Sequence, residues 1–264
     1  MSGYVFRSFG LKVLGQSDQQ TFQAGLASFV GEARLLAQFD HPSLVKVFRF
    51  WEANNTAYMV MPLYRGMTLK QARMRMRTPP TEAWLRKVLW SVLGALKVLH
   101  RGKALHRDVS PDNIFLQDIG PPVLLDLGAA RLAISDRAKQ HTAVLKVNYA
   151  PIEQYGEAGS VKQGPWTDLY ALGATMHFLL LGRPPLPAPA RAVEDESRPL
   201  ATLPLAGCSP ALLGLIDWML APRPTARPQS VADVIRVLAG DAAPPTPAMP
   251  SAQTVQHWER TQIL

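Results

Sequence analysis

Residues 106–113 read His106-Arg107-Asp108-Val109-Ser110-Pro111-Asp112-Asn113, and Asp126-Leu127-Gly128 begins eighteen residues after Asp108. Phosphoryl transfer from a nucleotide needs one carboxylate that accepts or orients the proton of the attacking hydroxyl. It also needs oxygen ligands that hold Mg²⁺ against the phosphates, and Mg²⁺ prefers hard oxygen donors. Asp108 suits the first role, and Asn113 with Asp126 suits the second.

Length and composition exclude several classes of protein. The chain has 264 residues, of which 47% are hydrophobic and 18% charged, so a folded core is expected rather than a disordered chain. The single cysteine, Cys208, excludes a disulfide framework and any CxxC metal site. The apolar stretch from Leu169 to Leu181 is too short to span a bilayer, and Met1–Leu14 lacks the apolar core of a signal peptide. We therefore expect a cytoplasmic protein that does not contact membranes.

The net charge of +8 is unevenly distributed along the chain. It predicts either two helices with solvated basic faces or a docking surface for acidic partners. The chain carries no zinc-finger spacing and no RNA-binding aromatic motif, so no nucleic-acid partner is expected. Between Arg65 and Lys103 the only acid is Glu82, and the ten basic residues are Arg65, Lys70, Arg73, Arg75, Arg77, Arg86, Lys87, Lys97, Arg101 and Lys103.

Apolar periodicity predicts a small sheet with one helix, followed by a mainly helical region. Thr68 and Gln71 have the spacing of a capping box at the start of a helix. Residues after Asp241 are rich in Ala, Pro, Thr and Gln and are expected to be disordered. The predicted helices are Phe22–Gln38, Thr68–Arg77, Thr81–His100, Thr167–Leu181, Leu212–Leu220 and Ser230–Leu238, and the predicted strands are Leu44–Phe50, Thr56–Met61, Ile114–Leu116 and Val123–Leu125.

Five motifs in order resemble those of the eukaryotic-like (Hanks-type) Ser/Thr protein kinases of bacteria. His106–Asn113 is similar to their HRDxxxxN loop, and Asp126–Gly128 is similar to their DFG motif. Ala150–Gln154 resembles the end of their activation segment, and Asp168–Gly173 resembles the start of their buried central helix. The resemblance implies that Arg227 pairs with the activation-segment glutamate, here Glu153.

The resemblance extends toward the N-terminus and covers about residues 22–240. The segment Phe22–Val47 resembles the regulatory helix and following strand, with Glu32 as the helix glutamate. The segment Tyr58–Gly66 resembles the hinge that holds adenine, which implies an ATP contact at Met61, Leu63 and Tyr64. ATP and Mg²⁺ are the implied cofactors, and Asn113 and Asp126 the implied metal ligands.

The front of the chain departs from the family pattern, because nothing there reads GxGxxG. In one alignment Phe9–Leu14 replaces the strand that carries the nucleotide-binding lysine, and Lys12 precedes Glu32 by 20 residues. In the other, Leu11–Phe22 corresponds to an insertion after that strand, and the strand itself is missing. On either alignment the N-terminal lobe is expected to be truncated.

The second departure is an apparent exchange of a lysine and a hydroxyl. Most Ser/Thr kinases have lysine two residues after the catalytic aspartate and threonine three residues before the tyrosine that is Tyr149 here. This chain has Ser110 and Lys146 at those positions. Either Lys146 supplies the catalytic cation from the activation segment, or it is a surface residue without a catalytic role.

The predicted fold is α+β, a protein-kinase-like bilobal fold with a reduced N-terminal β lobe (1–63), a complete, mainly helical C-terminal lobe (64–240) and a disordered tail (241–264). The implied function is ATP/Mg-dependent phosphorylation of protein Ser/Thr hydroxyls by Asp108, Asn113, Glu32 and Lys146. The alternatives are a pseudokinase or scaffold, and a small-molecule phosphotransferase of the aminoglycoside-kinase type. Thr261, with Leu264 three residues later, resembles a site for a forkhead-associated-domain partner.

Overall fold

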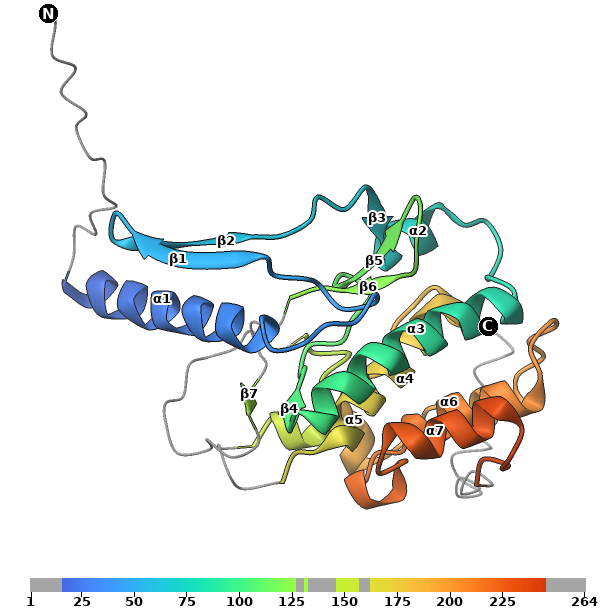
Figure 1. Ribbon diagram of the computed structural model, residues 1–264. Coiled ribbons are helices and arrows are strands. Elements are labelled where there is room, and N and C mark those ends of the chain that lie inside the picture. The colour runs from blue at the N-terminus through green and yellow to red at the C-terminus, as the bar shows by residue number, and fades with distance from the viewer. Residues whose placement is uncertain (1–15, 127–130, 133–145, 157–161, 246–264) are drawn as a thin grey trace, which may run out of the picture.

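A computed structural model describes residues 16–126, 131–132, 146–156 and 162–245. Its first part is a helix, α1 (Gln16–Leu36), beside a two-stranded antiparallel sheet of β1 (Arg49–Ala53) and β2 (Thr56–Val60), as Figure 1 shows. The strands meet in a turn at Asn54 and Asn55, whose φ values are 54° and 57°. Two left-handed residues in a row are typical of the two-residue turn that matches the twist of a hairpin.

Two predictions for this region need correction. The helix begins at Gln16, six residues before the predicted Phe22. The polar run 16–21 carries no apolar period, so the sequence pattern does not indicate a helix there. The strand predicted at Leu44–Phe50 is wrong, since β1 begins only at Arg49. Leu44 and Val45 instead pair with Leu124, and the backbone N–H of Val45 donates to the Leu124 carbonyl at 3.0 Å. Because Leu44 and Val45 pair with Leu124, they do not belong to the hairpin formed by β1 and β2.

The second sheet has three antiparallel strands, β3 (Gly66–Thr68), β5 (Ile114–Gln117) and β6 (Val123–Leu124). Helix α2 (Leu69–Arg75) follows β3, and the capping box predicted at Thr68 and Gln71 is present. A further short pair joins β4 (Ala104–Leu105) to β7 (Arg131–Leu132). The loop between β4 and β5 carries the HRD stretch, so the β4–β7 pair precedes it and the three-stranded sheet follows it.

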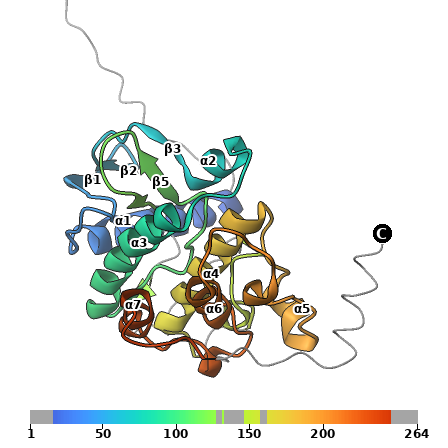
Figure 2. The same cartoon turned by 90° about the vertical axis from the view of Figure 1, so that its right-hand side faces the viewer.

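The remaining helices form the larger, C-terminal part of the molecule. Helix α4 (Pro165–Leu181) is buried along almost its whole length, and Figure 2 shows it among the other helices of this part. Gly173 of α4 permits close approach of α6 (Pro210–Met219), because a Cβ there would lie 2.9 Å from the Cβ of Met219. The helices are α3 (Glu82–Arg101), α4 (Pro165–Leu181), α5 (Ala188–Val193), α6 (Pro210–Met219) and α7 (Val231–Ala239), with 3₁₀ turns at Ile152–Gln154, Leu200–Thr202 and Pro224–Ala226.

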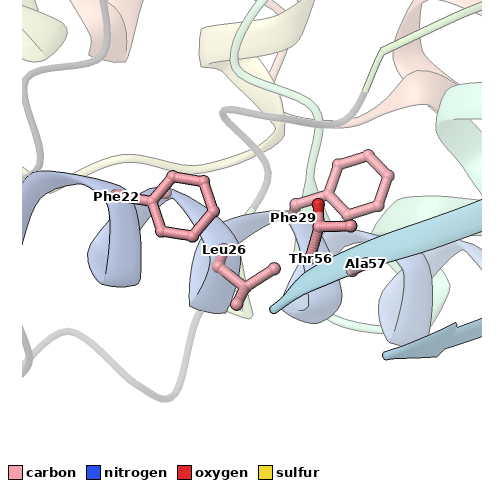
Figure 3. Close-up of a pocket in the computed structure, with 6 residues that line it drawn as sticks. Phe22, Leu26, Phe29, Thr56 and Ala57 are labelled. Carbon is pink, nitrogen blue, oxygen red and sulfur yellow. The ribbon is translucent and has the colours of Figure 1, made fainter. Parts of the chain in front are cut away.

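A hollow between α1 and β2 is apolar. Figure 3 shows Phe22, Leu26 and Phe29 of α1 beside Thr56 and Ala57 of β2. The residues that line it include no carboxylate, imidazole, amine or thiol, so a candidate acid or base is sought elsewhere. Across the described ranges, no helix has the length and apolar character needed to cross a membrane.

Candidate active site

Asp168, a fully buried residue in the first turn of α4, fixes the HRD loop by hydrogen bonds. Its carboxylate accepts the backbone N–H groups of His106 at 2.9 Å and Arg107 at 2.7 Å, and it bonds His100 Nε2 at 2.8 Å. Burial raises the pKa of Asp168, but the hydrogen bonds and nearby imidazoles outweigh it, so that pKa lies below its usual value. A charged carboxylate therefore fixes the start of the loop.

His106 connects this loop to the one that carries Asp126. The Asp108 N–H donates to His106 Nδ1 at 3.3 Å, so the proton is on Nε2, which donates to the Leu125 carbonyl at 3.0 Å. Burial lowers the pKa of His106, which keeps its ring neutral. His106 is therefore a packing and positioning residue, and it places Asp126 next to the HRD loop.

Four side chains meet at the centre of the site. Asn113 Nδ2 donates to Asp108 Oδ2 at 2.8 Å and to the Asp108 carbonyl at 2.9 Å. Lys146 Nζ lies 3.2 Å from Asp108 Oδ2 and donates to Ser110 Oγ at 2.8 Å. The two residues that the sequence analysis paired as an exchange, 36 positions apart, are thus in direct contact.

The charge state of Asp108 depends on its neighbours. Burial raises the pKa of this carboxyl above its usual value, and Lys146 and Asn113 oppose that rise. The Asp108 side chain is 23% exposed, so it is accessible from the surface while it remains partly desolvated. A carboxylate with a raised pKa and one exposed side can accept a proton from a hydroxyl that approaches it.

Two non-glycine residues at the site have left-handed backbone conformations, Arg107 with φ 67° and Asp126 with φ 57°. Such conformations cost free energy and persist where the surrounding bonds determine them. Arg107 follows His106 in the chain, and Asp126 follows Leu125. The Leu125 carbonyl accepts a hydrogen bond from the His106 ring, and the Leu125 N–H donates to the Asn113 carbonyl at 2.8 Å. These bonds hold the backbone of Asp126 close to Asn113.

The donor set at Asn113 and Asp126 is suited to Mg²⁺. Asn113 uses Nδ2 for both of its bonds to Asp108, which leaves Oδ1 as the atom for a metal ion. Asp126 is exposed and offers a carboxylate. Mg²⁺ is typically held by one or two such oxygen ligands together with substrate phosphates and water. A cage made by the protein alone is not expected, and the described residues contain no group of three or more His, Cys, Asp or Glu that could hold a metal ion.

The end of the activation segment is fixed by a buried ion pair. Glu153 Oε1 lies 2.8 Å from Arg227 Nη1, both side chains are fully buried, and the Thr167 hydroxyl donates to the same oxygen at 2.9 Å. Gln154 Nε2 donates to the Arg107 carbonyl at 2.8 Å. No local sequence pattern predicts this role of Gln154, because its bonding partner is 47 positions away.

The other predicted site residues lie on different elements of the fold. Glu32 is half-buried on α1, and Met61, Leu63 and Tyr64 lie in the segment between β2 and β3. Leu63 is 86% exposed, whereas the Tyr64 ring packs near Phe115 and its hydroxyl accepts the Lys46 N–H at 3.3 Å. Lys12, Leu127, Gly128 and Thr261 are outside the described residues.

Comparison with known proteins identifies the family of the chain. A model of the protein kinase domain matches residues 7–236. The serine/threonine-protein kinase pkn2 of Myxococcus xanthus is 31% identical over 232 residues, which are 82% of this chain and 27% of that protein. PrkC of Bacillus subtilis is 31% identical over 183 residues, which are 68% of this chain and 27% of PrkC. The chain thus spans about a quarter of the length of these relatives.

A solved structure titled "PpkA-294 apo form" is similar over most of both chains. The TM-score is 0.75 and the identity is 45%, with 86% of this chain and 79% of that chain covered. The predicted α+β fold, with few strands in its first part and a mainly helical second part, is confirmed by this match. The match to the domain model, the similarity to bacterial serine/threonine kinases and the Asp108–Asn113–Lys146 geometry lead to one conclusion: the chain belongs to the protein kinase domain family.

Proposed function

We propose that this chain is a serine/threonine protein kinase that transfers the γ-phosphoryl group of ATP to protein hydroxyls. The observation that carries the proposal is the contact of Lys146 with both Asp108 and Ser110. This contact brings together the Asp108 carboxylate, which can accept a proton, and the Lys146 cation, which can neutralise phosphate charge. Both are needed in phosphoryl transfer, where catalysis is mostly positioning and charge stabilisation.

Asp108 is the base in this proposal. The substrate hydroxyl approaches its exposed side, and the carboxylate orients the hydroxyl and takes its proton as the oxygen attacks the phosphorus. Asn113 holds the carboxylate through Oδ2 and the main chain through the Asp108 carbonyl, so the base cannot rotate freely. Asp168 restrains the same loop from below through two backbone N–H groups.

Lys146 supplies the positive charge that most family members place on the catalytic loop. Its Nζ is held by Ser110 Oγ beside Asp108, and in this proposal the transferring phosphoryl group meets the substrate hydroxyl there. A preorganised cation there stabilises the charge of the transition state without reorganisation. The lysine and the hydroxyl have exchanged their positions in the chain, and they still meet in space.

Asn113 and Asp126 would hold Mg²⁺, which supplies charge neutralisation at the phosphates of ATP. The segment between β2 and β3, with Met61, Leu63 and Tyr64, would contact adenine, and Glu32 would organise the nucleotide lobe. We place the lobe boundary after residue 63 and the end of the C-terminal lobe at about residue 240. Protein substrates, a cytoplasmic location and a forkhead-associated-domain partner for the tail around Thr261 belong to the same proposal.

The test is a nucleotide-binding titration with and without Mg²⁺, combined with an autophosphorylation assay with labelled ATP. We expect ATP binding that strengthens with Mg²⁺ and phosphate incorporation that depends on Asp108. Asp126→Ala should remove the Mg²⁺ dependence, and Asp112→Ala is the matched control because Asp112 pairs with Lys70 instead. Nucleotide binding without any transfer in the wild-type chain would contradict the proposal and favour a pseudokinase or scaffold.

A further inference from the structure

The exposed side of α3 carries a basic ridge that the proposed chemistry does not use. We define the α3 ridge as Lys87, Trp90, Lys97 and Arg101, which are separated by three, seven and four residues. These separations place side chains on the same face of a helix. All four residues are exposed, and Trp90 keeps 43% of its surface in solvent. The opposite face of α3, from Leu85 to Leu99, is packed in the core.

The charges of the ridge are not neutralised by the fold. Within the part of the chain that the structure describes, none of the recorded ion pairs involves Lys87, Lys97 or Arg101. Glu82, the acid nearest in sequence, is engaged by Arg86 and by Ser209. Every charged or indole group on the ridge is a hydrogen-bond donor, so the surface is complementary to a partner that offers acceptors and negative charge.

A role in helix stability accounts for only part of the ridge. Arg101 lies in the last turn of α3, where a cation interacts favourably with the helix dipole. That effect falls off within one turn, so it does not explain Lys97 or Lys87. An exposed tryptophan between lysines is also not required for helix stability or solubility. Tryptophan side chains are enriched at the centres of protein interfaces.

We propose that the α3 ridge is a docking surface for an acidic, extended protein segment with an apolar residue that packs on Trp90. Lys87 and Arg101 are 14 residues apart, which is about 21 Å along the helix axis and matches about six residues of extended chain. Helix α3 is flanked on one side by α7, where Arg86 Nη1 donates to the Leu238 carbonyl at 3.0 Å. The His41 ring lies against Gly94, which the same spacing places on the face of the ridge, between Trp90 and Lys97. A helix covered in this way cannot enter a DNA major groove, whereas an extended peptide can run past the His41 ring along the edge that carries Trp90 and Lys97.

The experiment uses the full chain and two fluorescein-labelled octapeptides, one all glutamate and one with a single phenylalanine among glutamates. We expect both to bind at 50 mM salt, the phenylalanine peptide more tightly, and both to weaken several-fold at 200 mM salt. Lys97→Glu/Arg101→Glu should weaken binding at least tenfold. Arg183→Glu/Arg223→Glu changes the net charge equally at exposed sites elsewhere and should leave binding within twofold. Trp90→Ala should remove the advantage of the phenylalanine peptide.

Three outcomes would overturn the proposal. Equal loss in the two double variants would show a response to net charge rather than to a site. No binding of either peptide at 50 mM salt would show that the ridge lacks affinity for acidic chains. Tighter binding of a twelve-nucleotide oligo-dT than of either peptide, lost in Lys97→Glu/Arg101→Glu, would assign the surface to single-stranded nucleic acid instead.

Discussion

Replacing Lys146 by methionine removes a cation 3.2 Å from Asp108 Oδ2 and 2.8 Å from Ser110 Oγ, with little change in side-chain length. At an effective dielectric constant of about 20, the attraction between unit charges at that separation is about 5 kcal/mol. Desolvation and solvent screening offset most of this attraction in the folded protein, because the Lys146 side chain is 29% exposed. We therefore expect the free energy of unfolding to change by less than about 1 kcal/mol.

Catalysis should respond far more strongly than stability. Loss of one preorganised donor at a developing negative charge typically lowers kcat by about 10²–10³-fold, or about 3–4 kcal/mol. We expect a decrease of that size in kcat/KM for Lys146→Met. The pH profile should also change, because Lys146 opposes the rise in the pKa of Asp108 caused by burial. Without the lysine that pKa rises further, so the base is protonated at higher pH and the acid limb of kcat/KM shifts upward.

The assay is steady-state phosphorylation of a peptide over a range of pH, with thermal unfolding of the same samples. The double variant Ser110→Lys/Lys146→Thr restores the arrangement usual in the family, and it should recover part of the activity lost in Lys146→Met. Unchanged kcat/KM in Lys146→Met would refute the role of Lys146. A loss of activity accompanied by a drop in Tm of 10 °C or more would instead show a structural role, since about 1 kcal/mol corresponds to about 2–4 °C in a domain of this size.

Three further predictions concern stability. Arg227→Ala leaves the buried Glu153 without its ion-pair partner, so urea unfolding should show a loss of about 3–5 kcal/mol in the free energy of unfolding. The control Arg223→Ala, at an exposed residue, should change that free energy by less than about 0.5 kcal/mol. A loss below about 1 kcal/mol in Arg227→Ala would mean that the pair is dispensable. Burial lowers the pKa of His177 from 6.5 to about 4, so the unfolded chain binds the extra proton between these pH values and stability falls as pH falls through them. By pH 5 this loss is at most about 2 kcal/mol, and His177→Phe should lose correspondingly less between pH 7 and pH 5 than the wild type does. Thr68→Ala removes the α2 capping box and should lower the free energy of unfolding by about 1 kcal/mol, with Thr78→Ala, an exposed residue beyond α2, as the control expected to show no effect.

Local patterns predicted the helical part of the molecule well. The expected helix Thr81–His100 corresponds to α3, and the expected helices Thr167–Leu181 and Ser230–Leu238 correspond to α4 and α7 within two residues at each end. These helices carry a cap or an apolar period that acts over a few residues, so their positions can be inferred without tertiary information. The hairpin was harder to place, because its residues alternate weakly and one face remains exposed.

The failure at Leu44–Phe50 has a tertiary cause. The apolar residues Leu44 and Val45 satisfy a strand pattern, but their backbone pairs with Leu124, eighty positions away from Leu44. Strand pairing depends on which partner is buried beside the segment, and no local window contains that partner. The missed bond between Gln154 and the Arg107 carbonyl has the same origin.

The chemical groups of the site can be identified without the fold: a carboxylate at Asp108, an amide at Asn113, a second carboxylate at Asp126, and a lysine and a serine in apparently exchanged positions. They follow from side-chain chemistry and from spacing within short motifs. That Lys146 reaches Ser110 and Asp108 rather than solvent depends on the folded arrangement of the two loops. That contact joins residues 36 positions apart on two loops. The buried Asp168 holds one loop through the Arg107 N–H, and the buried Arg227 holds the other through Glu153. The free energy that positions the lysine therefore comes from buried contacts distant in sequence, which the residues around Lys146 do not reveal.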